Sequence, residues 1–203
     1  MSKIVLYGHP LSPFVRMVHA VAEIVKSDYE FKVLDIENKE HKQEWYLKIN
    51  PQGKIPAITD GDFKLTESHA IMKYLCYKQG ETSLYPSDAI TRAKIDEALC
   101  RVTDSKFCWF VFVSQAFFNG GPTNQEKINE FEKGLLDFLS FHPDTAETGY
   151  LIGNQLTLAD IALAHRLSIP SLAGYKFEKF PEVKSMLEQI WSKKSGSIKS
   201  IQL

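Results

Sequence analysis

The sequence of 203 residues predicts an α/β domain followed by an all-helical domain. Within residues 1–80, strand and helix patterns alternate in the order β-α-β and then β-β-α. From residue 89 onwards, apolar residues recur at helical spacing. Turn-forming residues fill the stretch 82–90 between these patterns. We therefore expect two domains, at residues 1–80 and 89–203, each of ordinary domain size.

The first β-α-β unit is expected to begin with a strand at residues 4–7. Ser12 can cap the following helix, and Pro13 suits its first position, where a missing N–H is no loss. The apolar residues of this helix share one face: Phe14, Val18, Val21, Ala22 and Val25. Arg16 lies off that face. A second strand at residues 31–35 makes the helix a crossover between parallel strands.

The second half of the domain is expected to be a hairpin and a helix. Residues 57–59 and 63–65 flank the turn sequence Asp60-Gly61-Asp62, which is typical of antiparallel strands. Ser68 is then expected to cap a helix that ends near Lys78.

The stretch before this hairpin is the most informative motif of the chain. Ile55-Pro56 is a candidate cis peptide, because cis bonds are largely confined to X-Pro pairs. Such a bend would turn the backbone N–H and C=O of Ile55 outward, where an extended ligand could pair with them. The alternative is an ordinary tight turn, since Asn50-Pro51 and Gln52-Gly53 are turn-forming pairs.

Four helical patterns follow in the second domain: residues 89–118, 128–139, 158–167 and 181–191. Thr123 or Asn124 could cap the second of them. Thr157 and Asp160 have the spacing of a capping box before the third, with aspartate in place of the usual glutamate or glutamine. Residues 192–200 resemble a polar tail.

With these motifs, the chain resembles the cytosolic glutathione transferases along essentially its whole length. The first domain is similar to their thioredoxin-like N-terminal domain, and residues 156–162 are similar to the helix-capping segment of their helical domain. Residues 11–14 most resemble the plant-type serine classes, within a serine-type group that includes theta, delta, phi and tau. The resemblance implies a homodimeric enzyme that conjugates glutathione to small hydrophobic electrophiles, with reduction of organic hydroperoxides as a side activity.

The resemblance also implies that Ser12 activates the thiol of glutathione. A free cysteine thiol has a pKa of about 8.5, so the protein must stabilise the thiolate at neutral pH. A hydroxyl at a helix N-terminus can donate to the sulfur anion, and the helix adds positive potential. The alternatives are that Ser12 only caps the helix or that Tyr7 is the donor. Arg16 could assist the thiolate or form a structural salt bridge.

The rest of the glutathione site is carried over from the family. Glu67 and Ser68 resemble the pair that holds the γ-glutamyl end, although Ser68 could be a plain cap. Ile55 is expected to pair with the ligand backbone. His41 and Lys54 resemble residues that meet the glycine carboxylate, with Lys42 as a substitute for either. Taken singly, His41 and Lys54 are each more typical of a solvated surface residue.

Family members build the electrophile pocket from the loop after the first strand and from the helical domain. The candidate pocket residues here are His9, Leu11, Phe14 and Phe112. None of them identifies the second substrate. Asp104 corresponds to an aspartate that, in some relatives, reaches the γ-glutamyl amine bound by the neighbouring subunit.

Composition limits the other functions. A net charge of −1 gives no global case for binding nucleic acid or an anionic membrane. The histidines and cysteines show no metal-ligand spacing, so no metal is expected. Cys76, Cys100 and Cys108 are expected to be reduced thiols in the cytoplasm. The rival interpretations are a non-catalytic interaction module of the same fold and a carrier of hydrophobic ligands.

Overall fold

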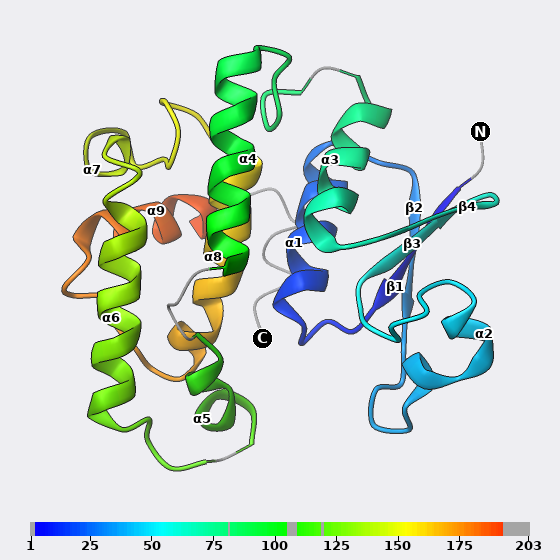
Figure 1. Cartoon of the computed structure of the whole chain (residues 1–203), viewed down its shortest axis with the longest axis horizontal. Helices are drawn as coiled ribbons and strands as arrows, with labels where there is room; N and C mark the ends of the chain where they lie inside the picture. The colour runs from blue at the N-terminus through cyan, green and yellow to red at the C-terminus, as the bar shows by residue number, and fades with distance from the viewer. Residues whose placement is uncertain (1–2, 81, 105–108, 119, 193–203) are drawn as a thin grey trace. The chain divides into compact units, whose positions relative to one another are not determined.

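The computed structural model describes residues 3–80, 82–104, 109–118 and 120–192 (Figure 1). Its contacts divide the chain into two units, with the boundary between Thr82 and Ser83. The first unit is α/β and the second is helical, which confirms the predicted fold class. Leu84 and Tyr85 fall in the expected linker, yet both are buried. The backbone C=O of Leu84 accepts a hydrogen bond of 3.0 Å from Leu158 N, so this stretch packs within the helical unit.

A four-stranded sheet in the order β2-β1-β3-β4 forms the centre of the first unit. Its strands are β1 (Ile4–Gly8), β2 (Tyr29–Val33), β3 (Ala57–Asp60) and β4 (Phe63–Thr66). β1 and β2 run parallel, joined by the crossover helix α1 (Pro13–Ile24), whereas β3 is antiparallel to both β1 and β4. The topology is as predicted, although β2 starts and ends earlier than the expected 31–35.

Helices lie on both faces of this sheet. α1 packs against α3 (Ser68–Lys78) on one face (Figure 1). A Cβ at Gly8 would lie 2.5 Å from a methyl carbon of Val15, so glycine lets α1 approach β1 closely. The short helix α2 (Glu44–Leu47) contributes Tyr46 to a cluster with Leu34 and Ala57, against which Tyr7 packs.

The helical unit is built around α8 (Leu158–Leu172), which is buried from Leu158 to Pro170. The other helices of this unit are α4 (Ala89–Asp104), η2 (Trp109–Phe112), α5 (Val113–Phe117), α6 (Gln125–Leu139), α7 (Asp144–Thr148) and α9 (Pro181–Ser192). α4, α5 and α9 all contact α8. A helix that is buried nearly all round suits this central position. The expected range 89–118 is not one continuous α-helix, because Trp109–Phe112 within it form the 3-10 turn η2.

The predicted helix starts of this unit are confirmed. The side chain of Asn124 accepts from Lys127 N at 2.9 Å and caps α6. Thr157 and Asp160 form the capping box of α8. α8 continues past the expected residue 167, and Pro170 is accommodated near its end. The expected tail lies outside the described residues from 193 onwards.

Within the described residues, no helix is long and apolar enough to cross a membrane. The same residues contain no group of three or more His, Cys, Asp or Glu side chains that could hold a metal ion. Cys76 and Cys100 are free thiols, the first buried and the second exposed, while Cys108 lies outside the described residues.

Candidate active site

The strand register brings four loops of the first unit to one edge of the sheet. Tyr7 pairs with Ala57, and Ala57 pairs with Thr66. Gly8, at the end of β1, pairs with Val33, at the end of β2. The segments that follow β1, β2 and β4 and the segment that precedes β3 therefore meet at this edge. In open α/β sheets, ligands bind outside the carboxyl ends of the parallel strands.

Ser12 stands at this edge as the N-cap of α1. Its hydroxyl oxygen accepts from Val15 N over a long 3.4 Å, and its backbone N–H donates to His9 O at 3.0 Å. Since the hydroxyl acts as an acceptor in the cap, its own proton can still be donated to another group. The first turn of α1 carries no acidic residue that would neutralise the positive end of the helix. The half-buried hydroxyl is thus suited to donate to an anion.

Tyr7, the alternative donor, lies in a different environment. Its hydroxyl shares a hydrogen bond of 3.3 Å with the hydroxyl of Thr59 on β3. Its ring centroid is 6.1 Å from those of both Trp45 and Tyr46, within the cluster beside α2. The geometry therefore gives Tyr7 a packing role.

Arg16 is buried, although its sequence position lies off the apolar face of α1. Only 4% of its surface is exposed, and this burial lowers the pKa of its guanidinium. Assistance of Arg16 to a thiolate stays a prediction.

At the start of α3, the structure corrects the expected cap. Glu67, rather than Ser68, occupies the N-cap position, and Ser68 is the first helical residue. Glu67 makes no side-chain cap and has a φ of 67°, a region that L residues with a side chain rarely adopt. Its carboxylate is therefore exposed and uncommitted to the helix, beside a Ser68 that is 9% exposed. Such an arrangement leaves the helix N-terminus available to an anionic group.

The Ile55-Pro56 peptide is cis. Within the part of the chain that the structure describes, neither the N–H nor the C=O of Ile55 makes a hydrogen bond. The preceding carbonyl, that of Lys54, accepts from Tyr46 Oη and Asn50 Nδ2, each at 2.7 Å. The backbone of Ile55 is thus left for a ligand, next to a carbonyl that already accepts two hydrogen bonds. The sequence alone did not indicate the roles of Tyr46 and Asn50.

The three candidate partners of the glycine carboxylate differ in their environments. The Lys42 ammonium donates to the carbonyls of Gln52 at 3.1 Å and Gly53 at 2.8 Å. For His41, burial and the nearby charges of Lys42 and Lys39 lower the pKa, which favours the neutral imidazole. Lys54 is exposed and makes no ion pair with any described residue. Lys54 is therefore the available cation of the three.

The candidate pocket residues belong to both units. In the loop after β1, His9 Nδ1 accepts from Leu11 N at 3.3 Å, and the side chain of Leu11 is 39% exposed. Phe14 is half-buried in the first turn of α1. Phe112, in the helical unit, is only 2% exposed and packs edge-to-face on Phe131 at a centroid distance of 5.1 Å. Its ring has almost no surface to offer a ligand, so its place is in the core.

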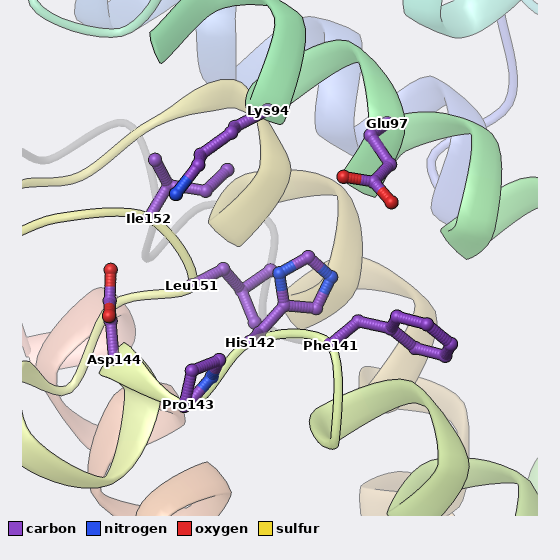
Figure 2. Close-up of a pocket in the computed structure, with 8 residues that line it drawn as sticks. All are labelled: Lys94, Glu97, Phe141, His142, Pro143, Asp144, Leu151 and Ile152. Atoms are coloured by element: carbon purple, nitrogen blue, oxygen red, sulfur yellow. The ribbon is translucent and has the colours of Figure 1, made fainter. Parts of the chain in front are cut away.

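The helical unit has a pocket of its own, which the sequence did not predict (Figure 2). It is lined by Lys94, Glu97, Phe141, His142, Pro143, Asp144, Leu151 and Ile152. Its volume is about 80 Å³, whereas pockets for small organic ligands measure about 300–1,000 Å³. This cavity is too small to be the site of a hydrophobic electrophile.

Comparison with known proteins identifies the family. Residues 2–76 match the family described as glutathione S-transferase, N-terminal domain, and residues 114–199 match glutathione S-transferase, C-terminal domain. Glutathione S-transferase 2 of Anopheles gambiae is 33% identical over 185 residues, which cover 87% of this chain and 85% of that relative. The chain belongs to the glutathione S-transferase family. By that membership it is a glutathione-transferring enzyme.

Solved structures of this family share the fold over nearly the whole chain. A glutathione transferase homologue from Drosophila mojavensis, solved with bound glutathione, is 31% identical with a TM-score of 0.82, covering 99% of this chain and 95% of that one. A poplar glutathione transferase is 26% identical with a TM-score of 0.83, covering 99% of this chain and 97% of that one. A delta-class glutathione transferase from Nilaparvata lugens is 26% identical with a TM-score of 0.84, covering 98% of this chain and 100% of that one.

Proposed function

We propose that this glutathione transferase is of the serine type and that Ser12 stabilises the thiolate of bound glutathione. The observation that carries the proposal is the place of Ser12, at the N-terminus of α1 and at the edge where four loops meet. Its long cap bond of 3.4 Å leaves the hydroxyl proton for the sulfur anion. Ionisation releases the thiol proton to solvent, and the pKa of the thiol falls below its usual value of about 8.5.

The tripeptide would lie along the same edge. The Glu67 carboxylate would take the γ-glutamyl ammonium, and Ser68 with the first N–H groups of α3 would take the neighbouring carboxylate. Ile55 would pair with the backbone of the cysteinyl residue through its unbonded N–H and C=O. Lys54 would meet the glycine carboxylate, and His41 would serve there as a neutral donor.

The chemical step follows from a thiolate held in place. The sulfur lone pair forms a bond to an electrophilic carbon of a small hydrophobic compound, and a leaving group departs with its bonding electrons. Catalysis rests on thiolate stabilisation and proximity. His9, Leu11 and Phe14 would offer apolar surface beside Ser12 to the electrophile.

As a side activity, the same thiolate would reduce organic hydroperoxides. It would attack the terminal peroxide oxygen, release an alcohol and form a sulfenic acid. A second glutathione would then convert the sulfenic acid to the disulfide and water.

Further proposals rest on the family alone. We propose a homodimer that works in the cytoplasm in the detoxification of electrophiles. Asp104 is exposed at the end of α4, where it could reach glutathione bound by a partner subunit. An interaction module or a ligand carrier of this fold would need neither Ser12 nor thiolate formation, which separates both from the enzyme.

The experiment is an ultraviolet titration of glutathione thiolate with the native protein, Ser12→Ala and Tyr7→Phe. We expect the native protein and Tyr7→Phe to lower the thiol pKa by about one unit or more, and Ser12→Ala to bind glutathione without doing so. Equal thiolate formation by native protein and Ser12→Ala would refute the role of Ser12. Absence of glutathione binding by the native protein would favour the interaction module.

A further inference from the structure

The turn ahead of Ile55 is held by side chains through three successive carbonyls. Those of Gln52 and Gly53 accept from the Lys42 ammonium, at 3.1 and 2.8 Å. The next carbonyl, of Lys54, accepts from Tyr46 and Asn50, as described above. A lysine ammonium has three donors and no acceptor, so one Lys42 can pair with two carbonyls at once. This pairing ends just before the unbonded backbone of Ile55.

Close packing supports the same contact. Gly53 has a φ of 58°, in the left-handed region that favours glycine. A Cβ at this position would lie 2.8 Å from the backbone oxygen of His41 and 2.9 Å from Lys42 Nζ. The 3-10 turn that carries His41 and Lys42 (η1, Glu40–Lys42) therefore lies directly against the turn, with no room for a side chain between them.

We propose that Lys42 is a positioning residue of the glutathione site, which fixes the turn that presents the Ile55 backbone and does not itself bind the glycine carboxylate. This role rests on the proposed function. It differs from the sequence interpretation, in which Lys42 was a substitute for His41 or Lys54. If the Lys42 ammonium turned towards a ligand carboxylate, it would lose its hydrogen bonds to two carbonyls. Lys54 makes no such hydrogen bonds with the described residues.

The two roles predict different responses to a ligand that lacks glycine. γ-Glutamylcysteine lacks the glycine and has its carboxylate on the cysteine, so replacing a residue that reaches the glycine carboxylate affects this ligand less than glutathione. A residue that positions Ile55 weakens glutathione and γ-glutamylcysteine by the same factor, because both ligands pair with that backbone. The comparison is a double-mutant cycle in which one change is made in the ligand.

The test is calorimetric titration of both ligands into the native protein, Lys42→Met, Lys42→Arg, Lys54→Met and Lys48→Met. Methionine keeps an unbranched apolar chain but has no donor, while arginine restores N–H donors. Lys48 is the matched control, because it is an exposed lysine nearby that pairs only with Glu44, at 2.8 Å. Hydrogen exchange of the peptide that covers residues 50–56 is measured on the same variants.

We expect Lys42→Met to weaken both ligands about threefold to tenfold and Lys42→Arg to recover part of the loss. Exchange of residues 50–56 should speed up in Lys42→Met and stay native in Lys48→Met. Lys54→Met should weaken glutathione alone. A loss for Lys42→Met that is confined to glutathione, or no loss with either ligand, overturns the positioning role. If the native protein does not bind glutathione, the proposed function fails first, and the role of Lys42 fails with it.

Discussion

Ser12 and Thr157 are hydroxyl residues at the N-caps of α1 and α8, and the two helix starts are built differently. At α8, Thr157 is fully buried, and Asp160 accepts from Thr157 N at 2.7 Å, Thr157 Oγ1 at 2.8 Å and Leu151 N at 2.7 Å. At α1, Ser12 is half-buried, its cap bond measures 3.4 Å, and no acidic residue follows in the first turn.

The difference separates a start built for stability from one open to a ligand. Around Asp160, the polar groups of the helix start are paired within the protein, and a buried unpaired donor would be costly. At Ser12, the hydroxyl proton can still be donated to a ligand, and the positive end of the helix can still attract an anionic group. The same cap chemistry can therefore serve the fold in one unit and the proposed reaction in the other.

The largest expected effect on stability is at the start of α8, where the polar groups are paired within the protein. Asp160→Ala leaves three buried donors without an acceptor, and we expect a loss of about 4 kcal/mol in the free energy of unfolding, measured in urea. The control is Asp144→Ala, because the Asp144 carboxylate accepts a single hydrogen bond from the described residues, from Gly153 N at 3.1 Å. Its loss should stay below about 1 kcal/mol. Equal losses in both variants would contradict the comparison.

At the start of α1, a substitution of Ser12 should lower the activity and barely change the stability. We expect Ser12→Ala to lower kcat/KM towards a chloronitrobenzene about 100-fold, equivalent to about 2.7 kcal/mol. The free energy of unfolding should fall by no more than about 1 kcal/mol, because the cap bond is long. A large loss of stability with little loss of activity would give Ser12 the same role as Thr157.

The start of α3 should show opposite effects on stability and binding. Glu67→Gly removes a side chain from a residue at φ 67°, so we expect a gain of about 1 kcal/mol in the free energy of unfolding. Loss of the carboxylate should at the same time raise the KM for glutathione about fivefold. Glu67→Gln, which keeps the side chain and the backbone cost, is the matched variant and should raise KM without the gain. If glycine destabilises the protein, the backbone of Glu67 is not under strain.

The smallest effect concerns a buried group of the helical unit that is only partly paired. Nε2 of His142 is buried and has no hydrogen-bond partner among the described residues. Burial lowers the pKa of His142 from 6.5, with Arg101 acting in the same direction and Glu97 and Asp144 opposing it. The unfolded state therefore takes up the proton first, and the folded state loses stability as the pH falls below 6.5.

Replacing this histidine should flatten that dependence. In His142→Gln, the unfolding free energy should depend less steeply on pH below 6.5. The slope should fall by an amount that corresponds to the uptake of up to about one proton on unfolding. The measurement is urea unfolding of both proteins at a series of pH values. An unchanged slope would show that the acid sensitivity comes from another group.

Much of the fold could be predicted because its signals are local. The hairpin turn, the start of α1 at Ser12-Pro13 and the capping box at Thr157 each depend on residues within one or two turns of chain. The prediction was wrong where packing decides a boundary. A single helix over 89–118 was expected from apolar spacing, which cannot register the change from α4 to η2.

For the candidate site, the sequence alone could indicate which residues to consider. It placed Ser12, Ile55, Glu67 and Ser68 in loops and at helix starts through turn chemistry and family resemblance. Tertiary structure decided what each can do, because partners far apart in the chain are brought together by register and packing. The pairing of Tyr7, Ala57 and Thr66 gathers the loops at one edge.

The lysines show the physical reason most clearly. The side chains of Lys42 and Lys54 are chemically identical and carry the same charge, so the sequence alone does not distinguish them. In the folded chain, two carbonyls of a turn take up the first ammonium, while the second makes no contact with the described residues that would keep it from a ligand. The hydrogen bonds that a side chain makes depend on its neighbours in space, and the fold determines which residues those neighbours are.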